Sequence, residues 1–441
     1  MTEVRKRQLA WVAGISAVIA LLAVWTFAID WEWSYIGDDV RIIQTIRRAS
    51  TEGGPFGVIA TAFTYAKGDL GDFFRPVSSF YPFFIYQFSP EIARGIRLIF
   101  LLVAFASVLR LTLRRGVTAL RNPFLIWVTA LLLANTSLYH GLWAPSVQEL
   151  TGVFLLSLFL LINNVYLRAA LLVLVALTKE PFIWLPLIYA FYVYFTDKRT
   201  KFAIGLGAVG TALVALLLRA YNSGGYVSGR LDAFNPWRWH ENLTQLFGAS
   251  ALFFLVLIVG LLVLKNELTF SRQATLMGAF SLSYLLSLMP FSTVGYFPGP
   301  GLFMGAAFAA CLTPKALKPG KTSWAQMSPL LIALLLSALA TVEFLRAEVF
   351  GRNTMVVELR DWVIGELPSG KSLGLINLSI NELGFIISEK DPTAEPLLVA
   401  WFPETQVDYI FVGLDASFPP GLTDCPATYV WTKGFLAPLK C

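Results

Sequence analysis

The chain has 441 residues, of which 56% are hydrophobic and only 14% are charged. Soluble domains carry roughly 25% charged residues, so this composition excludes an ordinary soluble globular protein. The formal net charge is +6, but the basic residues fall in short patches between apolar runs. That pattern is typical of the cytoplasmic loops of a membrane protein and does not indicate a nucleic-acid partner.

Apolar runs long enough to cross a bilayer recur along the chain. A membrane-spanning helix needs roughly 20 mostly apolar residues, and this criterion predicts about eleven crossings. The first run is too long for a cleaved signal peptide and is followed by Trp31 and Trp33. The predicted spans are 9–29, 92–113, 124–139, 151–166, 169–178, 181–195, 202–220, 245–264, 275–290, 302–314 and 328–345.

The lysines and arginines predict which ends of these spans face the cytoplasm. Basic residues lie before the first span and in every second connection, whereas the connections 138–150 and 291–301 contain none. Because cytoplasmic loops carry the excess of lysine and arginine, we expect a cytoplasmic N-terminus and an outer C-terminus. The expected location is therefore the cytoplasmic (inner) membrane.

Three segments on the predicted outer side are too long to be simple turns. The first outer loop, 30–91, contains two amphipathic stretches, 40–50 and 54–66, which are typical of helices in the membrane interface. The second segment is 221–244. The third is the tail, so we expect a membrane domain over 1–346 and a small periplasmic or extracellular α/β domain over 347–441.

The tail has an ordinary globular composition. It is predicted to hold a helix near 354–366 and strands in its apolar β-prone runs. Cys425 and Cys441 both lie on the oxidising side in this topology, which predicts a disulfide. The strand-like runs are 372–378, 396–402, 408–413 and 427–431.

Asp38 and Asp39 are the first acidic candidates for chemistry. One aspartate before a helix is explained as an N-cap, but a cap needs only one carboxylate and here there are two. Neighbouring side chains on a helix point about 100° apart, so one can cap while the other faces a site. A carboxylate held next to the bilayer is a plausible general base.

Two further elements place cations on the same predicted face. Arg75 stands in Asp72-Phe73-Phe74-Arg75-Pro76, where it either snorkels to lipid headgroups or grips a phosphate. Lys179-Glu180-Pro181 interrupts an apolar run from 169 to 195. It is read either as a tight turn, with Glu180 capping a helix that Pro181 starts, or as an anion site. The other candidates on this face are Trp143, Pro145, Glu149, Tyr226, Arg230, Arg238 and His240.

Taken in order, these residues resemble the GT-C superfamily of membrane glycosyltransferases. The resemblance covers roughly residues 1–200 and consists of the outer-loop pair Asp38-Asp39, the element Phe73-Phe74-Arg75-Pro76, and the turn Lys179-Glu180-Pro181. The superfamily includes protein O-mannosyltransferases, lipid A aminoarabinose transferases and serotype-converting glucosyltransferases. A GT-C-like fold with outer-face amphipathic helices is therefore expected.

The resemblance implies transfer of a sugar, with inversion, from a polyprenyl-phosphate-linked donor to a glycan, lipid or protein acceptor. It implies a role in the cell envelope, such as modification of a polysaccharide or lipopolysaccharide. Asp38 or Asp39 is the expected base, and Arg75, Lys179 and Arg230 are the expected ligands of the donor phosphate. The supporting residues are Glu180, Glu149, Tyr226, Arg238 and His240.

No cofactor is required by this reaction. Some relatives bind a divalent metal through paired acids, and Asp38, Asp39 and Asp72 could supply oxygen ligands for one. With two histidines and three cysteines in the chain, a zinc site is not expected.

Two other readings stay open. A lipid or solute transporter also uses charged residues in membranes, but internal symmetry and midplane polar residues are not evident in this sequence. An O-antigen polymerase or ligase would instead place its site at Arg230, Arg238 and His240, and Asp38-Asp39 would be incidental.

Overall fold

The computed structural model describes thirteen stretches of the chain. The first predicted span, the helix near 354–366 and the strand 396–402 lie outside them. The described residues are 38–67, 76–114, 121–143, 148–197, 199–222, 236–265, 268–290, 297–314, 324–350, 373–376, 409–412, 428–432 and 435–439.

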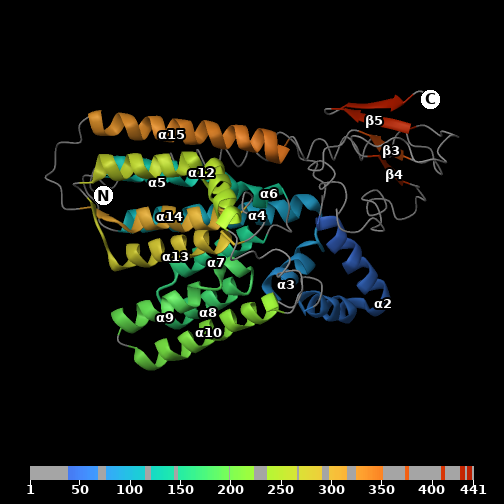
Figure 1. Ribbon diagram of the computed structural model, residues 1–441, viewed down its shortest axis with the longest axis horizontal. Helices are drawn as coiled ribbons and strands as arrows, with labels where there is room; N and C mark the ends of the chain where they lie inside the picture. The colour runs from blue at the N-terminus through green and yellow to red at the C-terminus, as the bar shows by residue number, and fades with distance from the viewer. Residues whose placement is uncertain are drawn as a thin grey trace, which may run out of the picture.

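Each predicted span that falls within the described residues coincides with a helix. Figure 1 shows these helices as one bundle in which most of the long axes run side by side. The helices are α4 (Pro90–Arg114), α5 (Arg121–Ala134), α7 (Glu149–Leu161), α8 (Val165–Ala176), α9 (Leu185–Thr196), α10 (Thr200–Asn222), α12 (Pro236–Leu264), α13 (Arg272–Leu288), α14 (Gly299–Cys311) and α15 (Trp324–Phe344).

Helix length and hydropathy identify an α-helical membrane protein. Among the described residues, four helical segments are long and apolar enough to cross a bilayer: Glu91–Thr112, Thr200–Arg219, Trp239–Leu264 and Met327–Ala347. A fifth is added if α5 and the following turn, bent by 56°, form one span. The other apolar helices are shorter; the 13 residues of α14 extend about 20 Å at 1.5 Å per residue.

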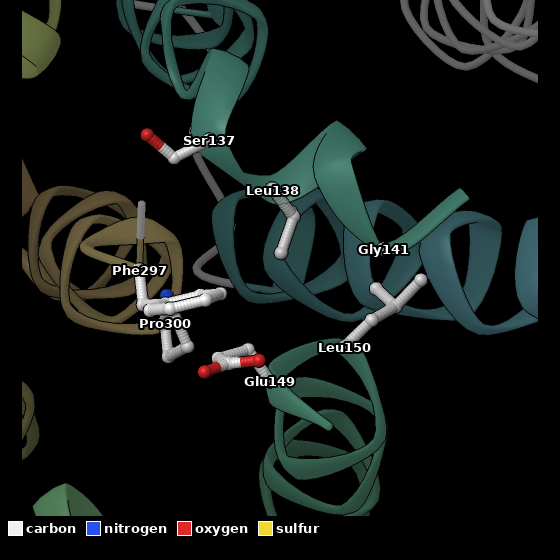
Figure 2. A pocket seen from close by; sticks show the side chains of 7 residues that line it. All are labelled: Ser137, Leu138, Gly141, Glu149, Leu150, Phe297 and Pro300. Carbon is white, nitrogen blue, oxygen red and sulfur yellow. The ribbon is translucent and has the colours of Figure 1, made fainter. Parts of the chain in front are cut away.

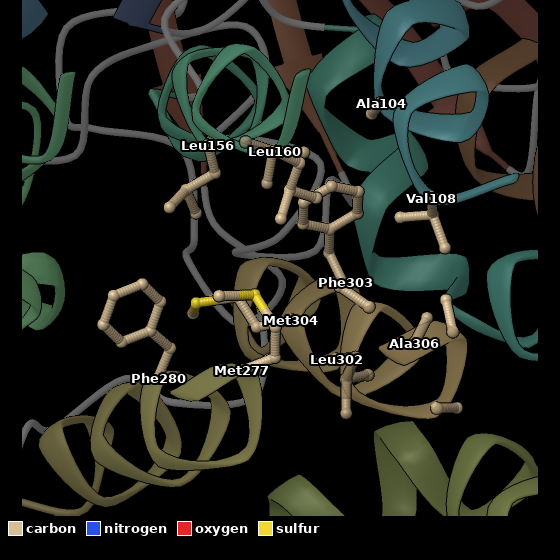
Figure 3. Close-up of a cluster of buried hydrophobic side chains, with 14 of the residues drawn as sticks. Ala104, Val108, Leu156, Leu160, Met277, Phe280, Leu302, Phe303, Met304 and Ala306 are labelled. Atoms are coloured by element: carbon tan, nitrogen blue, oxygen red, sulfur yellow. The ribbon is translucent and has the colours of Figure 1, made fainter. Parts of the chain in front are cut away.

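The core of the bundle is centred on α14. Of its 13 residues, all but Phe308 are buried, and many are glycine or alanine, which let neighbouring helices approach closely. Helices α4, α5, α7 and α13 contact it. Figure 3 shows the side chains that α4, α7 and α13 pack around Phe303 and Met304, namely Ala104, Val108, Leu156, Leu160, Met277 and Phe280.

The connections of the bundle separate to its two ends. The end of α12 and the start of α13 lie at one end, on the left of Figure 1. There β1 (Leu268–Thr269) pairs antiparallel with β2 (Thr313–Pro314). The short helices η1 (Thr136–Tyr139), α6 (His140–Trp143) and η2 (Glu180–Phe182) lie toward the opposite end. The described residues of the connections 138–150 and 291–301, which contain no lysine or arginine, lie toward this second end.

Both amphipathic stretches of the first outer loop are helical. They form α2 (Asp38–Lys67), which is broken at Gly54 (φ 57°, ψ −151°) before Pro55. Glycine adopts this left-handed backbone without a Cβ penalty, and proline suits the first turn of the next helix. The buried side chains of α2 pack with those of α3 (Pro76–Ile85) and the start of α4. That these helices lie in the membrane interface stays a prediction.

The tail contains a four-stranded sheet. Its strands are ordered β4-β3-β5-β6, with β3 parallel to β4 and β5, and β5 antiparallel to β6. Three of the predicted strand-like runs coincide with β3 (Leu373–Ile376), β4 (Tyr409–Val412) and β5 (Thr428–Thr432), and β6 (Phe435–Leu439) was not predicted. The division into domains at 346/347 stays a prediction.

Several boundaries differ from the expected spans, and one has a clear local cause. The helix predicted to continue to residue 166 ends at Leu161. Asn164 then caps α8, because its side-chain oxygen accepts hydrogen bonds from the backbone N–H groups of Tyr166 and Leu167. Asparagine is among the preferred N-cap residues. The cap at Asn164 therefore starts a new helix three residues after α7 ends at Leu161.

Candidate functional site

Lys179 lies in a sharp break between α8 and α9. Its backbone is extended (φ −158°, ψ 150°), and it is followed by the single 3-10 turn η2. Pro181 occupies a first-turn position, where its missing N–H needs no partner. Sequence reasoning expected Pro181 to start the next α-helix, but the α-helix starts at Leu185. The break turns the Lys179 side chain toward the start of α7.

Lys179 and Glu149 form an ion pair across this break. The Lys179 ammonium donates to Glu149 Oε1. Glu149 begins α7 and is only 5% exposed, whereas the Lys179 side chain is 22% exposed. The ammonium also lies 3.9 Å from the centroid of the Phe297 ring, a cation–π distance. The cation is therefore held from two sides, by a carboxylate and by an aromatic face.

A small pocket opens beside this ion pair (Figure 2). The Glu149 carboxylate lines it together with Phe297 and Pro300, and the remaining lining residues are Ser137, Leu138, Gly141 and Leu150. Three chain segments meet here: the turn before α6, the start of α7 and, far from both in sequence, the start of α14. Among the described residues, the lining is apolar apart from Glu149 and the Ser137 hydroxyl.

Two glycines allow these segments to approach each other. A Cβ atom on Gly141 would lie 2.6 Å from Leu150 Cβ, and one on Gly299 would lie 3.1 Å from the backbone of Leu138. Asn135 Nδ2 also donates to the carbonyl of Gly299 at 2.8 Å. The walls of the pocket are thus fixed by close backbone contacts.

Arg97 of α4 supports the same region and was not predicted. It is fully buried; its Nε donates to the carbonyl of Gly141 and its Nη1 to Thr151 Oγ1, both at 2.9 Å. Arg94, one turn earlier on α4, is 2% exposed. A signal was present in the sequence, because two arginines three residues apart stand within an apolar run, and charges at membrane depth are functional candidates.

The structure brings together two of the predicted site residues, Lys179 and Glu149, and places Glu180 next to them in η2, buried. Asp38 and Asp39 begin α2, and Arg238 lies in α12, but the structure describes no side-chain position for them. His240 is exposed on α12. The predicted residues that lie outside the described part of the chain are Asp72, Arg75, Pro145, Tyr226, Arg230, Cys425 and Cys441.

Within the described part of the chain, no group of three or more histidine, cysteine, aspartate or glutamate side chains could hold a metal ion. The predicted ligands Asp38, Asp39 and Asp72 have no described side chains, so a metal at these residues stays a prediction.

The arrangement suits recognition of an anion at the end of a membrane bundle. Lys179 and the buried Arg97 supply positive charge, and electrostatic interactions are stronger in buried surroundings than in water. Glu149 provides an acceptor beside the cation. A ligand that combines an anionic group with hydrogen-bond donors matches this pair.

Comparison of the chain with protein-family models, with curated proteins and with solved structures finds no match.

Proposed function

We propose that the chain is an inverting membrane glycosyltransferase of the GT-C type. It moves a sugar from a polyprenyl-phosphate-linked donor to a glycan, lipid or protein acceptor on the outer face of the cytoplasmic membrane. About eleven spans and a C-terminal domain outside the membrane belong to this proposal. The acceptor belongs to the cell envelope.

The observation that carries the proposal is the position of Lys179. This lysine is held by Glu149 and Phe297 at the end of the bundle where the connections 138–150 and 291–301, which contain no lysine or arginine, meet. By the charge rule this is the outer end. A lipid-linked phosphate reaches a site only where the site adjoins the membrane, and a lysine that is partly exposed at the end of apolar helices meets that condition.

The chemistry follows from charge development. Asp38 or Asp39 removes the proton of the acceptor hydroxyl, whose oxygen attacks the anomeric carbon as the bond from that carbon to the phosphate oxygen breaks. The lipid phosphate leaves with an additional negative charge. Lys179, with Arg75 and Arg230, stabilises that charge, and cations already in place are the most effective groups for this task.

The test is release of lipid phosphate by the purified protein from a panel of farnesyl-phosphate-linked sugars, with alkyl glycosides as acceptors. Loss of a general base lowers turnover by roughly 100- to 10,000-fold, so Asp38→Asn or Asp39→Asn should show that loss. Glu52→Gln is the matched control, because Glu52 is an exposed carboxylate on the same helix.

Undiminished turnover in both aspartate variants would refute the assignment of the base. No release by the wild-type protein from any donor in the panel would refute the proposed function.

A further inference from the structure

Glu149 has one carboxylate oxygen that the ion pair does not use. Oε1 accepts from Lys179, whereas Oε2 is buried and has no hydrogen-bond partner within the described part of the chain. A carboxylate offers about four acceptor positions, and a buried acceptor left unsatisfied calls for an explanation such as a ligand or an ordered water molecule. Glu149 lines the pocket described above.

The described residues that line the pocket direct no donor at this oxygen. Its other lining side chains are apolar except for Ser137, and Figure 2 shows the Ser137 hydroxyl directed away from the Glu149 carboxylate. With no such donor among the described residues, the donor is sought in a molecule that enters the pocket. The space admits a group about the size of a water molecule, which is also the size of one hydroxyl.

The neighbouring charge selects the kind of donor. The Lys179 ammonium lies on the other oxygen of the same carboxylate and repels a second cation, so a ligand ammonium is disfavoured. A neutral hydroxyl carries no such penalty. The apolar faces of Phe297 and Pro300 accommodate the C–H surface next to such a hydroxyl.

We infer that Glu149 Oε2 binds a hydroxyl of the donor sugar while Lys179 binds the adjoining phosphate. This inference rests on the proposed function, since it names the sugar of the lipid-linked donor as the ligand. In a glycosyl phosphate the phosphate and the nearest ring hydroxyl are attached to adjacent carbons. A cation and an acceptor that touch each other can therefore hold both groups, and Glu149 is a specificity residue for the sugar.

The test compares two kinds of probe: farnesyl phosphate, and farnesyl phosphates that carry glucose, galactose, mannose or arabinose. In the wild-type protein at least one glycosylated probe should bind more tightly than farnesyl phosphate. In Glu149→Gln the amide oxygen stays with the Lys179 donor, so the amide nitrogen replaces Oε2 and no longer accepts. One lost hydrogen bond to a charged group corresponds to about tenfold weaker binding of that glycosylated probe.

Farnesyl phosphate should respond in the opposite sense. Glu149→Gln removes a negative charge beside Lys179, so binding of the bare lipid phosphate should be unchanged or tighter. Lys179→Gln should weaken the binding of both kinds of probe. Glu343→Gln is the control, because Glu343 forms an exposed ion pair with Arg346 elsewhere in the chain. This variant should bind both kinds of probe as the wild type does.

If Glu149→Gln weakened the binding of both kinds of probe equally, the inference would be overturned, because Glu149 would then act only by holding Lys179. A glycosylated probe that binds no more tightly than farnesyl phosphate to the wild type would also overturn it, and an ordered water would then account for Oε2. Failure of the proposed function is seen separately, as binding of glycosylated probes without release of lipid phosphate or as binding of neither probe.

Discussion

Gly260 of α12 lies directly against the indole ring of Trp127 of α5. A Cβ atom on Gly260 would be only 1.9 Å from Trp127 Nε1. One turn earlier on α12, the carbonyl of Val256 accepts a hydrogen bond from the same nitrogen at 2.9 Å. Trp127 is fully buried. Because small residues let membrane helices approach closely, this contact sets the separation of α5 and α12.

Replacement of Gly260 by alanine should therefore separate these two helices. Overpacking a close-packed core costs about 1–3 kcal/mol, so we expect the thermal unfolding midpoint of Gly260→Ala to fall in a fluorescence melt of the detergent-solubilised protein. Gly248→Ala is the control on the same helix, because a Cβ atom there meets nothing within 4 Å. Equal midpoints for the two variants would contradict the contact.

Arg97 should contribute to stability through its two hydrogen bonds. Arg97→Met leaves the buried carbonyl of Gly141 without this donor, and the expected loss is about 2 kcal/mol or more. Thr151→Val should lower the free energy of unfolding by less, about 1 kcal/mol. In the Arg97→Met background the same substitution should cause no further loss, and a double-mutant cycle measures this coupling. Arg110→Met, at an exposed position on the same helix, should be nearly neutral. Additive losses in the cycle would exclude the bond between Arg97 and Thr151.

The helices of the bundle could be predicted because each is encoded locally. An apolar run such as 245–264 fixes a helix within α12 whatever surrounds it, since the backbone hydrogen bonds of a membrane segment must be made internally. The break at Gly54-Pro55 in α2 is likewise local, because both residues restrict the backbone at their own positions. The exact helix ends depended on caps such as Asn164, which a hydropathy reading does not weigh.

The pairing of Lys179 with Glu149 could not be predicted from the sequence. The two residues are 30 positions apart and are joined through α7 and α8, so their contact depends on how these helices pack. Sequence reasoning placed both on one face of the membrane but did not choose a partner for either. Arg97 was missed because it was counted within a predicted span, where the hydropathy average hides buried charges such as Arg94 and Arg97.

The ion pair itself should show a stability effect that depends on both partners. Lys179→Met leaves the Glu149 carboxylate buried without its cation, and the loss of one partner of a buried pair costs several kcal/mol. We expect about 2 kcal/mol here, discounted because the Lys179 side chain is partly exposed. The double variant Glu149→Met, Lys179→Met should recover most of that loss in the same unfolding assay. A double variant as unstable as Lys179→Met would argue against a direct pair.

The position of Lys179 should also depend on Gly152. A Cβ atom on Gly152 of α7 would lie 2.6 Å from the ring of Phe182, and Phe182 ends the 3-10 turn that follows Lys179. Phe182 is fully buried, with its ring centroid 4.8 Å from that of Tyr284, so it cannot move away freely. Gly152→Ala should therefore displace the turn, lower stability by about 1–3 kcal/mol and weaken binding of farnesyl phosphate.

A second substitution distinguishes this displacement from general damage to α7. Phe182→Leu removes the ring atoms that the new methyl group would meet, so stability and farnesyl phosphate binding should both be higher in the double variant Gly152→Ala, Phe182→Leu than in Gly152→Ala alone. Gly205→Ala, where a Cβ atom meets nothing within 4 Å, should leave both measurements unchanged. If Phe182→Leu restored stability but not binding, the turn would not be what positions Lys179, and the link from α7 packing to the anion site would be wrong.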